Sequence, residues 1–490
     1  MGDSVLKKVL TQSGIYWAAM MLSKTIGFFL IPLYTSYLDP KDYGVLELLT
    51  VTVDIMSLII GLQLVHAVAK FYTDAPSLEE KKQVISTSML LISLFSLLFF
   101  SGMLMLAGEI SMLIFDDYDH ELLLQMTFVS AILGIVNQVP LLFLRIQDKA
   151  IFFVVVTLSS FFLSVSLTIV FIVYMDMGVF GIILANLIAV VIVSVVLIFY
   201  TLRQVGLSFN VGTCIAMVSY SAPLIPGVIG LFVLNFSDRF FLNEYGSMEE
   251  VGIYAIGYKF GFLLSALVIS PFMLVWGVKM FEIYNEKNRN EILNKVLIWF
   301  AAVLLCLAAL ISIFIEEILT IMTNPKYYDA AIIVPIIAIA YVFTGLMKIV
   351  STPLYAEKRT GLIGMANLSA AIVCLALNFL LIPSYGGLGA AFSTLLSFAY
   401  IFVLLAYFSQ KHSDVVWEWS RLSRIFLIIV FVTAAGFVIS LDELWSVLLV
   451  KMSVFMFGLF LLYVFDAVPR DDCRFILSRM RQFLIVKARG

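Results

Sequence analysis

Charged residues are scarce in this chain. Only 13% of its 490 residues are Asp, Glu, Lys or Arg, whereas 62% are hydrophobic. A soluble protein carries roughly twice that share of charge. No basic domain of any size stands outside the apolar runs, which argues against nucleic-acid binding. The composition is that of an integral membrane protein, whose apolar side chains face lipid.

Cysteines are few and nucleotide-binding motifs are missing. The four cysteines, Cys214, Cys306, Cys374 and Cys473, show neither paired spacing nor a metal-ligand pattern. No P-loop is present to cradle the phosphates of a nucleotide. We therefore predict no metal site, no bound cofactor and no ATP hydrolysis by the chain.

Long apolar runs, in contrast, recur along the whole sequence. A helix needs about 20 residues to cross a hydrocarbon core of ~30 Å. We predict an all-α membrane protein with fourteen transmembrane helices, over residues 12–38, 43–72, 83–108, 121–145, 150–174, 178–202, 213–245, 251–279, 291–315, 328–350, 361–382, 386–408, 421–440 and 443–465. The first run is too long for a cleaved signal peptide, so we interpret it as a retained helix.

The distribution of lysine and arginine indicates which helix ends face the cytoplasm, because cytoplasmic loops carry an excess of both. With the N-terminus inside, the outer side carries only Lys41 and Lys326 of the 30 Lys and Arg residues. Four more, Lys24, Arg239, Lys259 and Lys451, fall within predicted spans, and the rest lie on the cytoplasmic side. This asymmetry favours a multi-pass protein with both termini in the cytoplasm.

An internal repeat divides the chain. The matched pairs are Gly44 with Gly252, Gly178 with Gly386 and Gly181 with Gly389 at an offset of 208 residues, and Leu144 with Leu354 at 210. We predict two six-helix lobes, 1–205 and 206–412, then a helix pair at 413–465 and a basic amphipathic cytoplasmic tail at 466–490. A plain solvated tail is the alternative. Since six is even, the lobes share one orientation and are related by an axis along the membrane normal, as in transporters that alternate access.

Four segments within residues 30–397 carry a resemblance to a known family. They read LIPLYTSYLDPKDYGVLELLTV, GLQLVHAVAKFY, SDRFFLNEYGSMEEVGIYAIGYKFG and LIPSYGGLGAAFSTLLS. They resemble Wzx-type polysaccharide-unit flippases of the MOP exporter superfamily. The resemblance implies export of undecaprenyl-pyrophosphate-linked oligosaccharides across the bacterial inner membrane for O-antigen, lipopolysaccharide, capsule or exopolysaccharide synthesis. It also implies membrane lipids, a glycan polymerase and a chain-length regulator as partners.

Other functions stay open beside this one. A MATE-like drug or solute exporter and a MurJ-like lipid II flippase belong to the same superfamily. A membrane-embedded glycan polymerase or acyl transferase is a different class, and it needs catalytic residues on a sizeable external loop. The external loops here are short and hold almost no Arg or His. We therefore predict a transporter with no catalytic residue.

Cations inside predicted spans are the main candidates for substrate contact, since each costs roughly 2.5–3.5 kcal/mol at the bilayer centre. Lys259 lies nine residues past Glu250, at a depth of about 13 Å. Lys24 is also central, and Arg239 is two turns inside the span 213–245 because the repeat aligns it with Ile31.

The resemblance implies that the spans carrying these cations line a central cleft. Lys24, Arg239 and Lys259 would then bind the pyrophosphate. Tyr258, next to Lys259, is a candidate for stacking on a sugar ring, although tyrosine is also frequent near membrane interfaces. The alternative is that each cation pairs with a buried acid or extends to the membrane interface. Arg145 and Lys70, near cytoplasmic helix ends, either receive the substrate or anchor the chain.

Two titratable residues are candidates for coupling to H⁺ or Na⁺. Asp54 lies inside the span 43–72, where it binds the ion or neutralises a lysine. His66 is either a proton relay or a packed interhelical residue. Asp238 and Arg239 are adjacent, so their side chains leave the helix about 100° apart, and we expect them to be poor partners.

Overall fold

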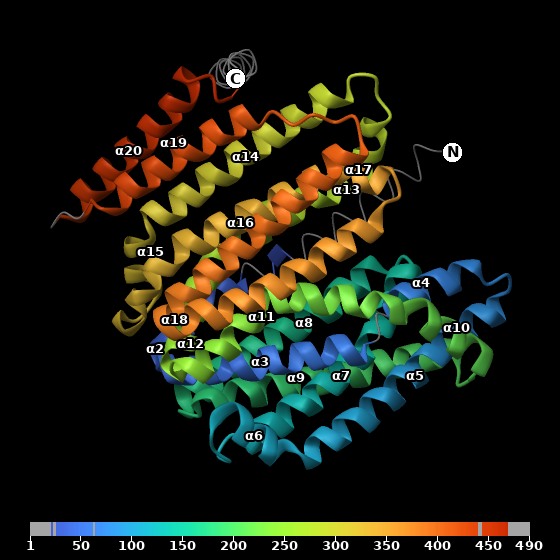
Figure 1. The fold of residues 1–490 in the computed structure, drawn as a ribbon. Coiled ribbons are helices and arrows are strands. Elements are labelled where there is room, and N and C mark those ends of the chain that lie inside the picture. Colours follow the sequence, from blue (N-terminus) through green and yellow to red (C-terminus); the bar gives the residue numbers. More distant parts are fainter. Residues whose placement is uncertain (1–20, 23–25, 62–63, 440–442, 469–490) are drawn as a thin grey trace, which may run out of the picture. The chain divides into compact units, whose positions relative to one another are not determined.

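The computed structural model describes residues 21–22, 26–61, 64–439 and 443–468 (Figure 1). Within these ranges the regular secondary structure is helical, and no strand occurs. The structure contains 11 described helices that are long and apolar enough to cross a membrane. The predicted all-α membrane fold is therefore confirmed, whereas the count of fourteen spans stays a prediction.

The longest of these helices, α18 (Thr360–His412), covers two predicted spans and bends between them. Its backbone leaves the helical region at Gly386, where φ is 52° and ψ is −131°. Glycine adopts a positive φ without the steric cost that a Cβ would add. Oε1 of Glu250 accepts a hydrogen bond of 2.6 Å from the N–H of Gly387, so a carboxylate holds the backbone directly after the bend.

The chain divides by packing into two compact units, and the first comprises Met1–Ala255 and Asn378–Gly387. Its helices are α2 (Ile31–Tyr37), α3 (Pro40–Ile60), α4 (Leu64–Asp74), α5 (Leu78–Met105), α6 (Ala107–Phe115), α7 (Glu121–Ile146), α8 (Ala150–Ile169), η1 (Val170–Tyr174), α9 (Gly178–Val205), α10 (Val211–Ser221), η2 (Ala222–Leu224), α11 (Ile225–Tyr245) and the start of α12 (Met248–Leu264). The central helix α7 packs on α3, α5 and α9. Helix contacts in lipid depend on close packing and interhelical hydrogen bonds.

The second unit comprises Ile256–Leu377 and Leu388–Gly490. Besides parts of α12 and α18, its helices are η3 (Ser265–Ile269), α13 (Ser270–Tyr284), α14 (Arg289–Ile313), α15 (Ile315–Met322), η4 (Pro325–Ile332), α16 (Ile333–Val350), α17 (Thr352–Ala356), α19 (Trp419–Phe437) and α20 (Leu444–Val464). Helix α14 packs on α16 and α19 (Figure 1). On α14, buried Asn294 donates to the carbonyl of Val416 and accepts from the N–H of Glu418, both at 2.7 Å, which fixes the start of α19.

Helix ends and turns recur at the spacing of the sequence repeat. Pairs 208 residues apart are the ends of α2 and α11 at Tyr37 and Tyr245, the starts of α3 and α12 at Pro40 and Met248, and the starts of α6 and α15 at Ala107 and Ile315. Gly178 and Gly386 share a positive φ of 51° and 52°. The repeat is thus present in the local backbone, and Arg239 lies inside α11 as the alignment predicts.

The turns after α7 and α17 match at the second predicted offset, 210 residues. Asp148 and Lys358 both have a positive φ, of 58° and 55°. The residue after each of them closes the turn with a backbone hydrogen bond. The N–H of Lys149 donates to the carbonyl of Leu144 at 2.9 Å, and the N–H of Arg359 donates to the carbonyl of Leu354 at 2.8 Å. The predicted lobe boundaries and the separate tail stay predictions, and residues 469–490 lie outside the described ranges.

Candidate functional site

Two facing helices of the first unit, α3 and α11, carry a stripe of charged and aromatic side chains. On α3, Glu47 and Asp54 are seven residues apart, which places them on one face about two turns from each other. On α11, Phe232, Phe236 and Arg239 follow the spacing i, i+4 and i+7, which is also one helix face. Since α3 and α11 pack together, these two faces define the candidate site.

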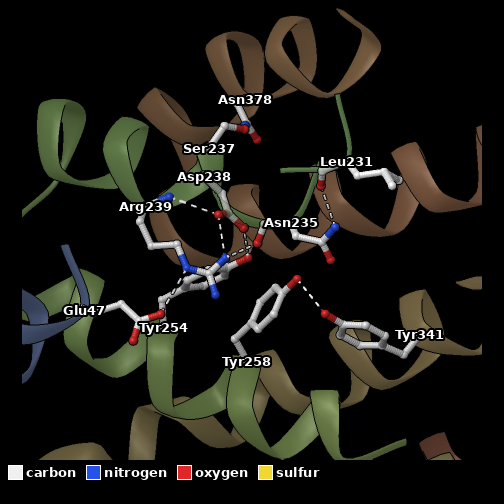
Figure 2. Close-up of polar contacts among 10 residues, drawn as sticks. All are labelled: Glu47, Leu231, Asn235, Ser237, Asp238, Arg239, Tyr254, Tyr258, Tyr341 and Asn378. Carbon is white, nitrogen blue, oxygen red and sulfur yellow. Dashed lines mark hydrogen bonds and ion pairs between the residues drawn. The ribbon is translucent and has the colours of Figure 1, made fainter. Parts of the chain in front are cut away.

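Arg239 lies at the centre of the charged part of this site and is only 1% exposed (Figure 2). Its Nη1 donates to the carbonyl of Asn235 and to Oδ1 of Asp238, both at 2.7 Å. Its Nε lies 3.5 Å from Oε1 of Glu47 on α3. The hydroxyl of Tyr254 on α12 donates to the other carboxylate oxygen of Asp238, so the cluster connects three helices.

The electrostatic balance of the cluster explains how the Arg239 cation stays buried. Two carboxylates, Asp238 and Glu47, face one guanidinium. The rings of Phe236 and Tyr254 each have their centroid 5.3 Å from the guanidinium carbon, a cation–π distance. The attraction to such partners offsets part of the desolvation cost that a buried charge carries.

The expectation that Asp238 and Arg239 make poor partners is wrong. It rested only on the directions in which the two side chains leave the helix. Oδ1 of Asp238 also accepts from the backbone N–H of Arg239 at 3.0 Å, so the carboxylate leans toward the next residue. The arginine side chain is long enough to fold back onto that same oxygen.

A cavity of about 360 Å³ adjoins the cluster on the same stripe. Its lining residues are Asp54, Ser57, Leu58, Gly61, Val65, Gln138, Phe232 and Phe236. Phe236 connects the cavity with the charged cluster, because its ring lines the cavity and also makes the cation–π contact with Arg239. The carboxylate-bearing Asp54 is exposed rather than packed. A carboxylate in such a cavity can take up a proton or a small cation.

A second polar contact anchors α11 one residue before the cluster. Asn378, on the part of α18 that belongs to the first unit, donates to Oγ of Ser237 at 3.0 Å (Figure 2). Both side chains are buried. The segment of α11 that carries Asp238 and Arg239 is therefore held from α18 as well as from α3 and α12.

Two predicted site residues, Lys70 and Arg145, lie at helix ends of the first unit. The Nζ of Lys70 on α4 is 4.5 Å from the ring centroid of Tyr220. The guanidinium carbon of Arg145, at the end of α7, is 5.8 Å from the ring centroid of Phe153. Both side chains are exposed. Their predicted role in receiving the substrate stays a prediction.

Of the remaining predicted site residues, two belong to the second unit and two lie outside the described part of the chain. Lys259 is half-buried on α12 and belongs to the second unit. Tyr258 in that unit is buried, and its hydroxyl accepts a hydrogen bond of 2.9 Å from the hydroxyl of Tyr341 (Figure 2). Lys24 and the side chain of His66 lie outside the described part of the chain. The predicted grouping of three cations in one cleft therefore stays a prediction.

Glu47 and Gln138 belong to the site although neither was predicted from the sequence. For Glu47 a usable signal existed, because its spacing of seven residues from Asp54 shows that both share one face of α3. Gln138 lies in an apolar stretch of α7, and no local pattern connects it with a cavity formed by α3, α4 and α11.

Comparisons with known proteins place the chain in a family. A family described as polysaccharide biosynthesis protein matches residues 9–276, more than half of the chain. The probable low-salt glycan biosynthesis flippase Agl15 of Haloferax volcanii is 26% identical over 217 residues, which is 42% of this chain and 44% of the relative. An uncharacterized membrane protein of Methanocaldococcus jannaschii is 25% identical over 208 residues, 40% of this chain and 39% of the relative. The matched region thus spans less than half the length of either relative.

Solved structures of MOP-superfamily transporters share the fold. The lipid II flippase MurJ in an inward closed conformation aligns with a TM-score of 0.73 and 16% identity, over 92% of this chain and 98% of MurJ. An inward-facing multidrug MATE transporter aligns with a TM-score of 0.65 and 15% identity, over 79% of this chain and 94% of the transporter. The predicted MOP/MATE-like fold is therefore confirmed.

Proposed function

Because the chain belongs to the polysaccharide biosynthesis protein family, we propose that it is a flippase for a lipid-linked glycan. The substrate is an undecaprenyl-pyrophosphate-linked oligosaccharide, which moves from the cytoplasmic to the outer leaflet by alternating access. The observation that carries the proposal is the presence of cations within membrane-spanning helices, with Arg239 on α11 and Lys259 on α12. A diphosphate headgroup needs such donors to leave water.

Arg239 has a specific task in this proposal. Its guanidinium is held by the carboxylates of Asp238 and Glu47. A pyrophosphate that reaches Arg239 competes with these two acids for the N–H donors of the guanidinium. Its affinity therefore depends on how much more strongly the guanidinium binds the pyrophosphate than the carboxylates. Such exchange permits release, whereas a guanidinium without acids would retain the phosphate. Lys259 and Lys24 add movable point charges.

Asp54 is the proposed site of ion coupling. Its carboxylate lines the cavity beside Phe236, whose ring stacks on Arg239. Uptake of H⁺ or Na⁺ at Asp54 removes one negative charge from the α3–α11 stripe. That change strengthens the attraction between the stripe and an anionic headgroup, so the ion and the substrate favour each other.

Several finer points belong to the same proposal. The glycan is a unit of O-antigen, capsule or exopolysaccharide, and the membrane is the bacterial inner membrane. Both termini are cytoplasmic, and the flippase supplies a glycan polymerase and its chain-length regulator. We assign the chain no catalytic step.

A MATE-like exporter is the second candidate. The observation that favours it is the combination of Asp54 with the rings of Phe232 and Phe236 in one cavity, which suits a cationic aromatic compound. An exporter of this kind leaves surface glycan unchanged when it is deleted, and it changes resistance to such compounds.

The test is glycan export in a deletion strain that is complemented with variants. Wild-type chain and Lys279→Ala are expected to restore surface glycan, because Lys279 is an exposed residue paired with Glu282 on the surface. Lys259→Ala is expected to reduce export at equal protein amount, and Lys259→Arg is expected to retain part of it. Normal surface glycan in the deletion strain would refute the function. Full complementation by Lys259→Ala would refute only the assignment of Lys259.

A further inference from the structure

A second cavity of the first unit has an uncharged polar lining. It measures about 590 Å³ and lies between the Ile26–Tyr37 segment and helices α7, α8 and α9. Its polar lining comes from Tyr34, Asn137, Thr157, Ser160, Ser164 and Asn186. None of the described residues that line it is Asp, Glu, Lys, Arg or His. Its volume falls within the range of about 300–1,000 Å³ that is usual for small-molecule sites.

Asn137 gives this cavity a buried acceptor without a protein partner. The side chain is 5% exposed, and its Nδ2 donates to Oγ of Ser194 at 2.8 Å. Ser194 donates its own proton to the carbonyl of Val190 at 2.7 Å, which fixes the orientation of the Asn137 amide. No described residue donates to Oδ1 of Asn137. A buried acceptor that stays unpaired loses the hydrogen bond it would make in water, so a ligand that donates a proton to it is favoured.

Helix α8 supplies a row of hydroxyls along the cavity. Thr157, Ser160 and Ser164 follow the spacing i, i+3 and i+7, which is one face of the helix. The hydroxyl of Thr157 donates to the carbonyl of Phe153 at 2.8 Å, so its oxygen can still accept. The hydroxyl of Ser164 donates to Oδ1 of Asn186 at 2.8 Å.

The chemistry of the lining distinguishes between classes of ligand. Asn137 and Thr157 offer acceptors, whereas the amide N–H groups of Asn186 are donors that no other described residue engages. A buried cation or anion needs a countercharge, which the described lining lacks. Hydroxyl groups both donate and accept, so an uncharged polyhydroxylated ligand matches this set.

We infer that this cavity binds a neutral sugar residue of the lipid-linked oligosaccharide, an inference that rests on the proposed function. The sugar supplies the proton that Oδ1 of Asn137 lacks and contacts the hydroxyl row of α8. In this assignment the charged headgroup and the uncharged glycan are recognised by different parts of the chain, the first by cations and the second by amides and hydroxyls.

The test uses a cysteine inside the cavity. Ser160→Cys is introduced after the four native cysteines are replaced by alanine, and the full chain is reconstituted in nanodiscs free of sugar-based detergent. We expect a small maleimide to react with this cysteine and neutral sugars, glucose and N-acetylglucosamine, to slow the reaction. A sugar concentration equal to Kd occupies half the sites and slows labelling about twofold.

Control variants distinguish binding in the cavity from a general effect of sugar on labelling. Ser159→Cys lies on the neighbouring exposed position of α8, outside the lining, and its labelling is expected to be independent of sugar. Thr157→Val and Asn137→Leu are expected to abolish protection at Ser160→Cys. Thr157→Val guards against loss of protection through misfolding. The hydroxyl of Thr157 bonds only to the backbone of its own helix, so its removal is expected to leave the fold intact.

Three outcomes would overturn the inference. One is labelling that no sugar slows, and another is protection by NaCl relative to KCl, which would identify a cation site. A cysteine that never reacts would show that the cavity is closed to solvent. If the wild-type chain complements glycan export in cells and no sugar protects, the sugar site fails while the proposed function stands. If it does not complement, the function itself fails.

Discussion

Gly44 on α3 and Gly252 on α12 lie where the two helix backbones touch, and neither position has room for a side chain. A Cβ on Gly44 would collide with the carbonyl of Met248, and a Cβ on Gly252 would collide with that of Pro40. Met248 and Pro40 each precede a glycine of the pair by four residues, so the contact is reciprocal. Since the two glycines are repeat equivalents, the repeat is preserved here as a local two-fold contact.

Substitution at this contact is expected to destabilise the protein. Gly252→Ala and Gly44→Ala each force the two helix backbones apart, because the colliding atoms are backbone carbonyls that cannot rotate away. We expect a clear fall in the thermal unfolding temperature of the purified protein. Gly277→Ala on α13 is the control, since nothing lies within 4 Å of its Cβ position. Equal unfolding temperatures for all three variants would contradict the reciprocal contact.

Removal of the buried guanidinium should destabilise the first unit more than removal of the whole charge cluster. Arg239→Met removes the guanidinium that the mostly buried carboxylates of Asp238 and Glu47 contact, which costs about 3–5 kcal/mol. Arg239→Met combined with Asp238→Asn and Glu47→Gln is expected to recover most of that loss. Thermal unfolding of both variants checks this order.

The same triple variant separates stability from substrate contact. If it is stable but exports no glycan, the guanidinium itself is needed for transport. If it is stable and exports normally, Arg239 has only a structural role. Arg203→Ala, which removes an exposed arginine that stacks on Phe199, serves as the control for loss of positive charge.

The coupling assignment predicts a loss of gradient dependence at Asp54. Asp54→Asn keeps the shape of the side chain in the cavity but removes its charge, so neither H⁺ nor Na⁺ binds there. We expect the flipping rate in proteoliposomes to stop responding to a pH or sodium gradient. Asp42→Asn, an exposed carboxylate in the first turn of the same helix, is expected to respond like wild type. A wild-type response of Asp54→Asn would locate coupling elsewhere.

Local and periodic features were predictable from the sequence, whereas long-range pairing was not. The repeat predicted that Arg239 lies inside a helix and that Gly178 and Gly386 occupy equivalent positions. These features were predictable because backbone conformation depends mainly on residues close by in the sequence. The partners of the charges were not predictable. Asp238 and Arg239 were expected to be poor partners, and the two acids near Lys451 lie over 130 residues away in sequence. Such pairs depend on how helices pack and rotate, which no local spacing encodes.

Lys451 on α20 provides the last prediction, because it is 1% exposed and bonds to Glu317 on α15. Its Nζ lies 2.6 Å from Oε1 of Glu317 and 3.9 Å from Oε2 of Glu316. Lys451→Met leaves the carboxylate of Glu317 mostly buried without its cation, at a cost of about 3–5 kcal/mol. We expect faster hydrogen exchange over α20 and a lower unfolding temperature.

The matched variants identify this pair as the source of the effect. Lys451→Met with Glu317→Gln is expected to recover stability, which gives a favourable coupling energy in a double-mutant cycle. Glu316→Gln is the control and should change little, since that side chain is 51% exposed and its oxygen lies farther from Nζ. If Lys451→Met and Glu317→Gln destabilise additively, the two residues act independently and the ion pair does not hold α20 to α15.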